Sequence, residues 1–149
     1  MKRYDHLVSG LRKKGFKITP QRKIIIDILS NDESHPGAES ILKRARQRSQ
    51  KMSLSTVYST LTLLKKEGLI RELEFNNMDN RYEANTSDHF NLVCLGCRKI
   101  FDFKKGKPVP TEKIQRATGF LVTGMRFEYY GYCKECNPTC CEGGMADIP

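Results

Sequence analysis

The sequence lacks long apolar segments. No hydrophobic run approaches the roughly 18–20 residues that a membrane-spanning helix needs. The opening residues Met1–Asp5 are not followed by the apolar core of a signal peptide. We therefore expect no membrane contact and no secretion, and we predict a cytoplasmic protein. Thiols stay reduced in that compartment, so paired cysteines there favour a metal over a disulfide.

Histidine is also scarce, because the whole chain has three. The His-Glu-x-x-His motif of many zinc hydrolases is missing. A hydrolytic zinc site, with an open coordination position for water, would have to be assembled from dispersed residues. We keep a zinc hydrolase as a remote alternative and predict that the chain is not an enzyme.

Basic residues outnumber acidic ones, and their distribution is uneven. The formal net charge is +9. Residues 1–80 hold sixteen Lys and Arg against nine Asp and Glu, a net charge of +7, whereas residues 81–149 hold ten against eight, a net charge of +2. This balance favours a polyanionic partner for the first half of the chain.

Two cysteine pairs dominate the second half of the sequence. Cys94 and Cys97 are separated by two residues, as are Cys133 and Cys136, and this spacing lets both thiolates of a pair reach one ion. Four thiolates complete a closed tetrahedral site, so the predicted Zn2+ is structural rather than catalytic. Gly96 fits a tight turn that needs a positive φ. The alternatives are a redox dithiol or two disulfides, although a thioredoxin-like thiol needs one such pair between a strand and a helix.

The first half of the sequence predicts a winged helix-turn-helix. Apolar periodicity predicts four helices, over 4–14, from Thr19 onward, over 37–48 and over 53–67, and then a hairpin over 69–75 and 81–84. Thr19 is predicted to cap the second helix, with Pro20 at its first position, and Ser53 to cap the fourth. In this fold the fourth helix enters the major groove of duplex DNA and the hairpin is the wing. A small helical domain with a trailing hairpin is the alternative.

The outer face of the fourth predicted helix carries small hydroxyl side chains. A helix that is merely solvated usually carries Glu and Lys instead. Hydroxyl side chains suit a helix that fits into a groove and bonds to phosphates or base edges. The predicted DNA-binding residues are Ser55, Thr56, Tyr58 and Ser59 on this helix, with Lys13, Lys14 and Arg22 in the basic stretch around the first two helices.

After residue 84 the pattern changes to short strands with one helix. Strands are predicted around 91–93, 99–103 and 120–132, and a helix over 111–118 with Thr111 as its cap. An exposed strand at 127–130 invites pairing with a second copy of the chain, so we predict a homodimer. The predicted fold class is α+β, divided into a winged-helix domain over 1–84, a hinge over 85–90, a small α/β dimerisation and metal-binding domain over 91–137, and a disordered tail over 138–149 in which Cys140 and Cys141 are assigned no role.

A second set of metal-ligand types is scattered over both halves of the chain. Imidazole and carboxylate together suit Fe(II), Mn(II) or Zn(II), and the share of oxygen favours iron or manganese. One ion held by these groups would join the two predicted domains. Dispersed histidines and acids are more often ordinary surface residues, so the residues alone leave both interpretations open. The candidates are His35, Glu83, Asp88, His89, Asn91 and Asp102.

Several short motifs carry a family resemblance over roughly residues 7–136. They are Ile18-Thr19-Pro20-Gln21-Arg22, His35-Pro36, Ser53-Leu54-Ser55-Thr56-Val57-Tyr58, Arg81-Tyr82-Glu83 and Thr86-Ser87-Asp88-His89, together with the two cysteine pairs. With these motifs the chain resembles the ferric uptake regulator (Fur) family of metal-dependent repressors. The resemblance implies a dimeric winged-helix repressor of double-stranded operator DNA, with a structural Zn2+ and a regulatory Fe2+ or Mn2+ at the interdomain hinge. It also makes Tyr58 a base contact.

Within this family the chain is most similar to the peroxide-responsive branch. The resemblance places the regulatory ligands at His35, Glu83, His89 and Asp102, with Asn91 at a fifth position. That branch normally has Asp at position 83, where iron regulators have Glu, and it normally has His at position 91. The resemblance implies that operator DNA is released when the hinge metal is lost, or when bound Fe(II) reacts with hydrogen peroxide and a ligating histidine is oxidised.

A further metal site of the iron regulators has no counterpart in this sequence. Its matching positions are Asp88, Phe90 and Met125, and neither Phe90 nor Met125 can bind a hard divalent ion. A single regulatory site favours the peroxide branch. An iron- or manganese-responsive repressor of metal uptake genes is the alternative, and a zinc-stabilised interaction module without a DNA role is a more remote one.

Overall fold

The structure is a computed structural model, and it describes residues 2–75, 78–104 and 106–138. The chain divides into two compact units, residues 1–86 and residues 87–149. Apart from residue 138, the tail predicted to be disordered lies outside the described residues, as do Cys140 and Cys141. The predicted hinge over 85–90 stays a prediction. Among the described helices, none is long and apolar enough to cross a membrane.

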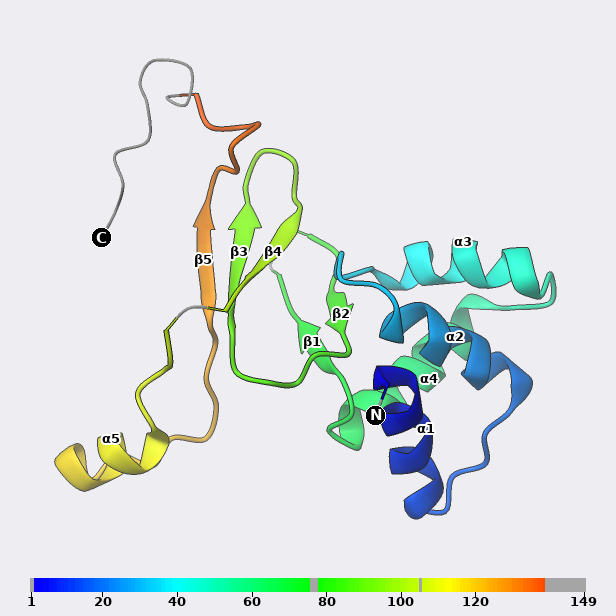
Figure 1. The fold of residues 1–149 in the computed structure, drawn as a ribbon, viewed down its shortest axis with the longest axis horizontal. Coiled ribbons are helices and arrows are strands. Elements are labelled where there is room, and N and C mark those ends of the chain that lie inside the picture. Colours follow the sequence, from blue (N-terminus) through cyan, green and yellow to red (C-terminus); the bar gives the residue numbers. More distant parts are fainter. Residues whose placement is uncertain (1, 76–77, 105, 139–149) are drawn as a thin grey trace. The chain divides into compact units, whose positions relative to one another are not determined.

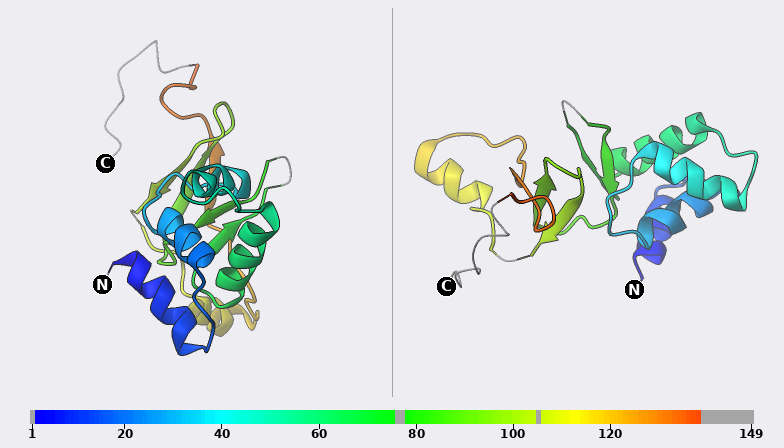
Figure 2. Two further views of the ribbon diagram at one scale, coloured as in Figure 1. Left: turned by 90° about the vertical axis from the view of Figure 1, so that its right-hand side faces the viewer. Right: turned by 90° about the horizontal axis from the view of Figure 1, so that it is seen from above.

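The first unit consists of four helices followed by a two-stranded hairpin (Figures 1 and 2). Within it, β1 and β2 pair antiparallel, with Glu72 directly opposite Tyr82. This order is that of a winged helix-turn-helix, in which α4 is the recognition helix and the hairpin is the wing. The elements are α1 (Arg3–Lys13), α2 (Pro20–Ser30), α3 (Ala38–Arg48), α4 (Leu54–Lys66), β1 (Arg71–Leu73) and β2 (Arg81–Glu83).

Two of the helix starts follow from local side-chain caps. The Thr19 hydroxyl accepts a hydrogen bond from the backbone N–H of Arg22 at 3.3 Å, and Pro20 occupies the first turn of α2. The Ser53 hydroxyl accepts one from the N–H of Thr56 at 3.2 Å. Each cap satisfies an N–H group that the first helical turn leaves without an intrahelical partner. Both predicted caps are confirmed.

The core of the first unit fixes the recognition helix. Burying one aliphatic side chain contributes about 1.5–3 kcal/mol to stability. Burial of the apolar stripe of α4 therefore strongly favours one orientation of that helix. The opposite face of α4, which carries Ser55 and Ser59, is thereby left at the surface. The core includes Leu7, Leu11, Ile25, Ile28, Leu29, Ile41, Val57, Leu61, Leu64 and Tyr82.

The second unit is a three-stranded sheet with one short helix. The strand order is β4-β3-β5, in which β3 pairs antiparallel with β4 and parallel with β5. Both units together give the predicted α+β class. The elements are β3 (Phe90–Cys94), β4 (Ile100–Phe103), α5 (Thr111–Thr118) and β5 (Glu128–Gly131).

Two predictions for the second unit are wrong in detail. The strand predicted over 120–132 extends only over Glu128–Gly131, because β3 offers it a ladder only from Asn91 to Cys94. Thr111 does not cap α5. The extended N-cap residue is Pro110, and it makes no side-chain cap hydrogen bond. Thr111 is the first helical residue, so its hydroxyl lies past the position from which a cap reaches the next N–H groups.

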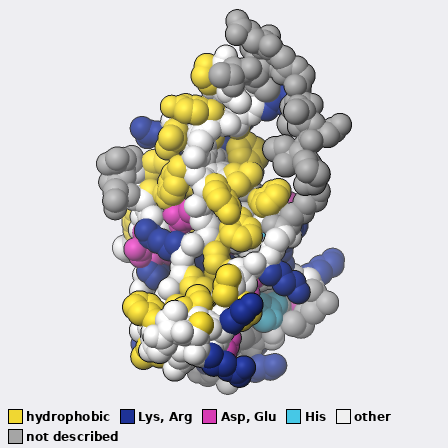
Figure 3. Space-filling model, turned by 90° about the vertical axis from the view of Figure 1, so that its left-hand side faces the viewer, with side chains coloured by type: hydrophobic (Ala, Val, Ile, Leu, Met, Phe, Trp, Pro, Cys, Tyr) yellow, Lys and Arg dark blue, Asp and Glu magenta, His cyan; other side chains and the backbone are white. Residues whose placement is uncertain are grey.

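Exposed apolar side chains gather on the second unit. Figure 3 shows hydrophobic side chains together on one face of it. Phe120 and Leu121 are 66% and 68% exposed, and β5 lies at the sheet edge with Tyr129 and Tyr130 more than half exposed. A large exposed apolar face is typical of an interaction surface, because monomeric proteins rarely leave one uncovered.

Candidate metal centres and nucleic-acid interface

The four paired cysteines meet in the second unit, where one ligand atom from each lies within 4.8 Å of all the others. The sulfurs of Cys97 and Cys133 are 3.8 Å apart, and none of the four forms a disulfide. A tetrahedron with Zn–S bonds of about 2.3 Å has sulfurs separated by about 3.8 Å. The cluster therefore fits a closed Zn2+ site, and its four thiolates leave no position for water.

Each cysteine pair with the turn between its thiols forms a knuckle, the first at Cys94–Cys97 and the second at Cys133–Cys136. The first knuckle needs glycine at position 96 for a different reason from the one predicted. Gly96 is not among the residues with positive φ; instead Arg98, just after the pair, has a φ of 60°. A Cβ at position 96 would lie 2.8 Å from the Cβ of Cys136 and 2.9 Å from its sulfur. Gly96 is thus required by the close approach of the opposite knuckle, which only the folded structure reveals.

Backbone N–H groups favour the thiolate form of one cysteine in this cluster. The N–H groups of Cys133 and Cys97 donate to the sulfur of Cys94 at 3.3 and 3.5 Å, and these bonds lower the pKa of Cys94 to about 6. The pKa of Cys136 is raised to about 12, chiefly by its hydrogen bond with Cys133 and by burial. Each thiol therefore hinders the ionisation of its neighbours. A bound Zn2+ supplies the positive charge that stabilises four thiolates together.

Two of the predicted regulatory ligands, His35 and Glu83, lie in the first unit. His35 precedes α3 and Glu83 ends β2, and the backbone N–H of Tyr82 donates to the carbonyl of Pro36 at 3.1 Å. This bond aligns the two segments, so His35 Nε2 lies 2.9 Å from Glu83 Oε2, with both side chains almost fully buried. His35 has a φ of 55°, in the left-handed region that non-glycine residues seldom occupy. Backbone strain of this kind clusters at functional sites.

The other predicted regulatory ligands, His89, Asn91 and Asp102, lie in the second unit. Asn91 on β3 is directly opposite Asp102 on β4, and His89 lies two residues before Asn91. Directly opposite residues of an antiparallel pair point to the same face of the sheet, so Asn91 and Asp102 share a face, while His89 lies just before β3. His89 Nε2 lies 3.7 Å from Asp102 Oδ1, and His89 Nδ1 lies 2.8 Å from the carbonyl of Ser87. Since a carbonyl only accepts, Nδ1 carries a proton, so Nε2 is the nitrogen that a metal ion would use.

Asn91 suits a weak ligand. Its side chain is 4% exposed, and its Oδ1 has no hydrogen-bond partner among the described residues. A buried amide oxygen without a donor is costly, and a cation would satisfy it. The contact between the Ser87 carbonyl and His89 was not predicted from the sequence, although both residues belong to the motif Thr86-Ser87-Asp88-His89.

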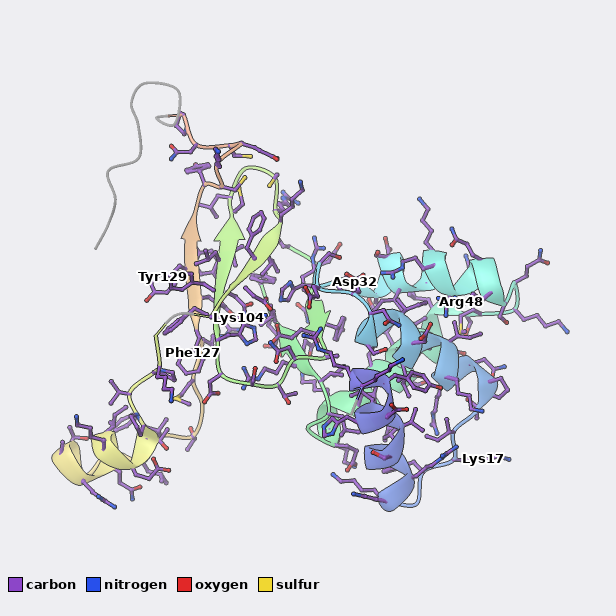
Figure 4. The ribbon with its side chains drawn as sticks, in the orientation of Figure 1. Lys17, Asp32, Arg48, Lys104, Phe127 and Tyr129 are labelled. Carbon is purple, nitrogen blue, oxygen red and sulfur yellow. The ribbon has the colours of Figure 1, made fainter. Side chains whose placement is uncertain are left out.

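Position 90 belongs to the further metal site of the iron regulators, and the residue there cannot bind a hard divalent ion. Phe90 packs its ring against Phe127 at 5.6 Å and Tyr129 at 5.5 Å between centroids. Figure 4 labels both partner rings near the start of β5. Phe90 is thus a half-buried aromatic residue that packs on other rings of the second unit, while Met125 is 48% exposed.

The recognition helix presents the predicted DNA-binding face. Ser55, Tyr58 and Ser59 are exposed, and Tyr58 is 48% accessible, whereas Thr56 is half-buried. The Thr56 hydroxyl is 2.8 Å from the hydroxyl of Ser53. Tyr58 also borders a hollow of about 310 Å³ that is lined by the wing and the start of α3.

The predicted phosphate-binding cations have distinct surroundings. Lys13 is exposed at the end of α1. Lys14 Nζ donates to both the carbonyl of Glu67 at 3.2 Å and its carboxylate at 2.6 Å, which ties α1 to the end of α4. Arg22 is half-buried, and its guanidinium donates to the carbonyl of Lys17 at 2.6 Å. Sequence spacing gave no sign of the Lys14 pair, because its partner is 53 residues away.

A winged helix followed by a sheet unit with a thiolate metal cluster defines a class of metal-dependent DNA-binding regulator. The ferric uptake regulator family matches residues 13–130, and the chain belongs to this family. The peroxide operon regulator of Bacillus subtilis (strain 168) is 38% identical over 131 residues, covering 87% of this chain and 90% of the relative. The peroxide-responsive repressor PerR of Staphylococcus epidermidis is 37% identical over 133 residues, or 89% of each chain.

A solved structure of a family member gives the same fold. The ferric uptake regulator Fur of Helicobacter pylori, described as having three functional metal binding sites, is 27% identical. It matches with a TM-score of 0.70 over 96% of this chain and 94% of that one.

Proposed function

We propose that this chain is a metal-dependent transcriptional repressor that binds operator DNA as a homodimer and responds to peroxide. The observation that carries the proposal is the buried His35–Glu83 pair in the same unit as the recognition helix. The curated relatives that cover most of the chain are named as peroxide-responsive regulators, which supports this function over metal uptake control. The chain acts by binding rather than by turnover, and its place of action is the cytoplasm.

The regulatory ion is held by ligands from both units. His35 and Glu83 from the first unit bind it together with His89 and Asp102 from the second, and Asn91 is at most a weak fifth ligand. Two imidazoles and two carboxylates suit Fe(II) or Mn(II). When Fe(II) is bound, it supplies the chemistry with hydrogen peroxide that a peroxide response requires.

Binding at these ligands favours the conformation that fits DNA. The ion can shift the equilibrium only by the difference in its affinity for the two conformations. In the metal-bound dimer the two recognition helices match successive major grooves, and without the ion this spacing is lost. Ser55, Thr56, Tyr58 and Ser59 face the bases, and Lys13, Lys14 and Arg22 lie near phosphates. The apolar face of the second unit holds the dimer together.

The structural zinc is bound by Cys94, Cys97, Cys133 and Cys136. Four thiolates supply a large share of the folding free energy of a small subdomain, so this ion stabilises the unit that forms the dimer. Cys97→Ser is expected to give protein that contains no zinc and is monomeric or aggregated. Zinc-free wild-type protein that dimerises normally would contradict this role.

The test of the function is a selection of DNA from a random duplex library with Mn(II)-loaded protein. The expected result is enrichment of a two-fold symmetric sequence with Mn(II) and no enrichment in excess chelator. Enrichment that is equal under both conditions would show a DNA-binding protein without metal control. No enrichment under either condition would favour the interaction module.

Position 83 favours a second candidate, an iron- or manganese-responsive repressor. Glu83 is the residue of the iron regulators at this position, and its side chain is one methylene longer than Asp. Glu83→Asp should then raise the sensitivity of the operator complex to peroxide. If wild type keeps its DNA affinity after peroxide treatment with Fe(II) bound, while Glu83→Asp loses it, the metal-responsive function is correct.

A further inference from the structure

A carboxylate in the wing connects the recognition helix to the rest of the hairpin. Glu72 lies in the middle of β1, and its side chain is 11% exposed. Its Oε2 accepts a hydrogen bond from Nζ of Lys65 in the last turn of α4. Its Oε1 accepts from the amide of Asn80 at 2.9 Å and from the hydroxyl of Tyr82 at 3.0 Å. One side chain thus joins the helix, the wing turn and β2.

These bonds outweigh the cost of burying the charge. Burial raises the pKa of Glu72, but the hydrogen bonds from Lys65, Asn80 and Tyr82 bring it below its ordinary value. The carboxylate therefore stays ionised, and charge-assisted hydrogen bonds are about twice as strong as neutral ones. The connection is correspondingly stiff.

Tyr82 is joined at the same time to the predicted metal ligands. It directly precedes Glu83, and its backbone N–H bonds to the carbonyl of Pro36, the residue after His35. Tyr82 is 4% exposed within the core, and it lies directly opposite Glu72, to whose carboxylate its hydroxyl donates. A displacement of Glu83 therefore moves the residue whose hydroxyl holds the Glu72 carboxylate.

We propose that Tyr82 and Glu72 are positioning residues that transmit metal binding at the His35–Glu83 pair to the recognition helix through Lys65. This inference rests on the proposed function, and it names a path within the DNA-binding unit itself. Tyr82 carries the displacement across the hairpin, and Glu72 passes it to α4. Loss of either link leaves metal binding intact but lowers the factor by which metal strengthens DNA binding.

The experiment measures this coupling factor directly. The DNA dissociation constant of each dimer is determined by anisotropy with saturating Mn(II) and with excess chelator, and the ratio is the coupling factor. Mn(II) affinity without DNA is measured by the electron paramagnetic resonance of free Mn(II). The variants are Tyr82→Phe, which removes only the hydroxyl, and Glu72→Gln, whose amide oxygen can still accept from Tyr82 while its amide nitrogen cannot accept from Lys65. Tyr4→Phe, a partly buried ring on the same core, is the matched control.

We expect Tyr82→Phe and Glu72→Gln each to lower the coupling factor by at least about fivefold, within the usual range of allosteric factors. Mn(II) affinity without DNA should stay within about twofold of wild type, and Tyr4→Phe should keep the full coupling factor. If both variants weaken DNA binding equally with and without Mn(II), their role is purely structural and the inference is overturned. A wild-type protein without any Mn(II) dependence would overturn the proposed function itself, a result that is distinguishable before any variant is made.

Discussion

Adding one methyl group at position 96 should damage the zinc site more than any change of similar size nearby. In Gly96→Ala the new Cβ would lie 2.8 Å from the Cβ of Cys136 and 2.9 Å from its sulfur. Real Cβ contacts are wider, so one knuckle must move. A free side chain could rotate away, but a bound zinc holds the Cys136 sulfur in place. Overpacking of this kind costs about 1–3 kcal/mol.

That cost appears as weaker zinc binding, because the strain is present only when both knuckles close on the ion. Each 1.4 kcal/mol is a factor of ten, so zinc affinity should fall by roughly 5- to 140-fold. Competition with a chromophoric chelator of known zinc affinity measures it. Gly124→Ala is the matched control, since a Cβ there meets no described atom within 4 Å. Zinc affinity within twofold of wild type in Gly96→Ala would refute this account of the knuckle packing.

Four further changes test other parts of the structure. Tyr58→Ala should weaken operator binding by about 1–3 kcal/mol and random-sequence binding much less. Lys13→Ala should weaken both alike and lower the slope of log affinity against log salt concentration by about one. Titrations at several salt concentrations measure both effects. Asp32→Asn should lower the thermal midpoint at pH 7 and have less effect as the pH falls below about 4. Burial raises the pKa of Asp32, but bonds from Ser34 and Arg44 bring it below its ordinary value of 3.8, so the stabilisation is present above that pH and is lost as the carboxyl protonates. Asn91→His should tighten Mn(II) binding in a direct titration, because an imidazole replaces a weak amide ligand.

Most features decided by neighbouring residues were predictable from the sequence, although the cap predicted at Thr111 was wrong. The caps at Thr19 and Ser53 depend on the next three residues, and the cysteine spacing fixes how two thiolates reach one ion. Features decided by distant residues were not. The length of β5 depends on β3, and the need for Gly96 depends on Cys136, 40 positions further along the chain.

The candidate metal ligands also depend on residues that are distant in the sequence. His35 and Glu83 were expected together because of a family resemblance, while spacing alone gave no reason to pair residues 48 positions apart. Their contact depends on the hydrogen bond between Tyr82 and Pro36, a tertiary feature. The carboxylate of Glu72 went unnoticed because a glutamate in a short strand has no sequence signature until its three donors are known.

In the proposed function, metal bound through His35 controls DNA binding. The most direct measurement is the DNA affinity of wild type and His35→Ala by anisotropy, with Fe(II), with Mn(II) and with chelator, before and after hydrogen peroxide. Wild type should bind DNA tightly with either metal and lose affinity after peroxide only with Fe(II). His35→Ala should bind DNA weakly under every condition while keeping its cysteine-bound zinc. A His35→Ala protein that responds to metal as wild type does would contradict the account.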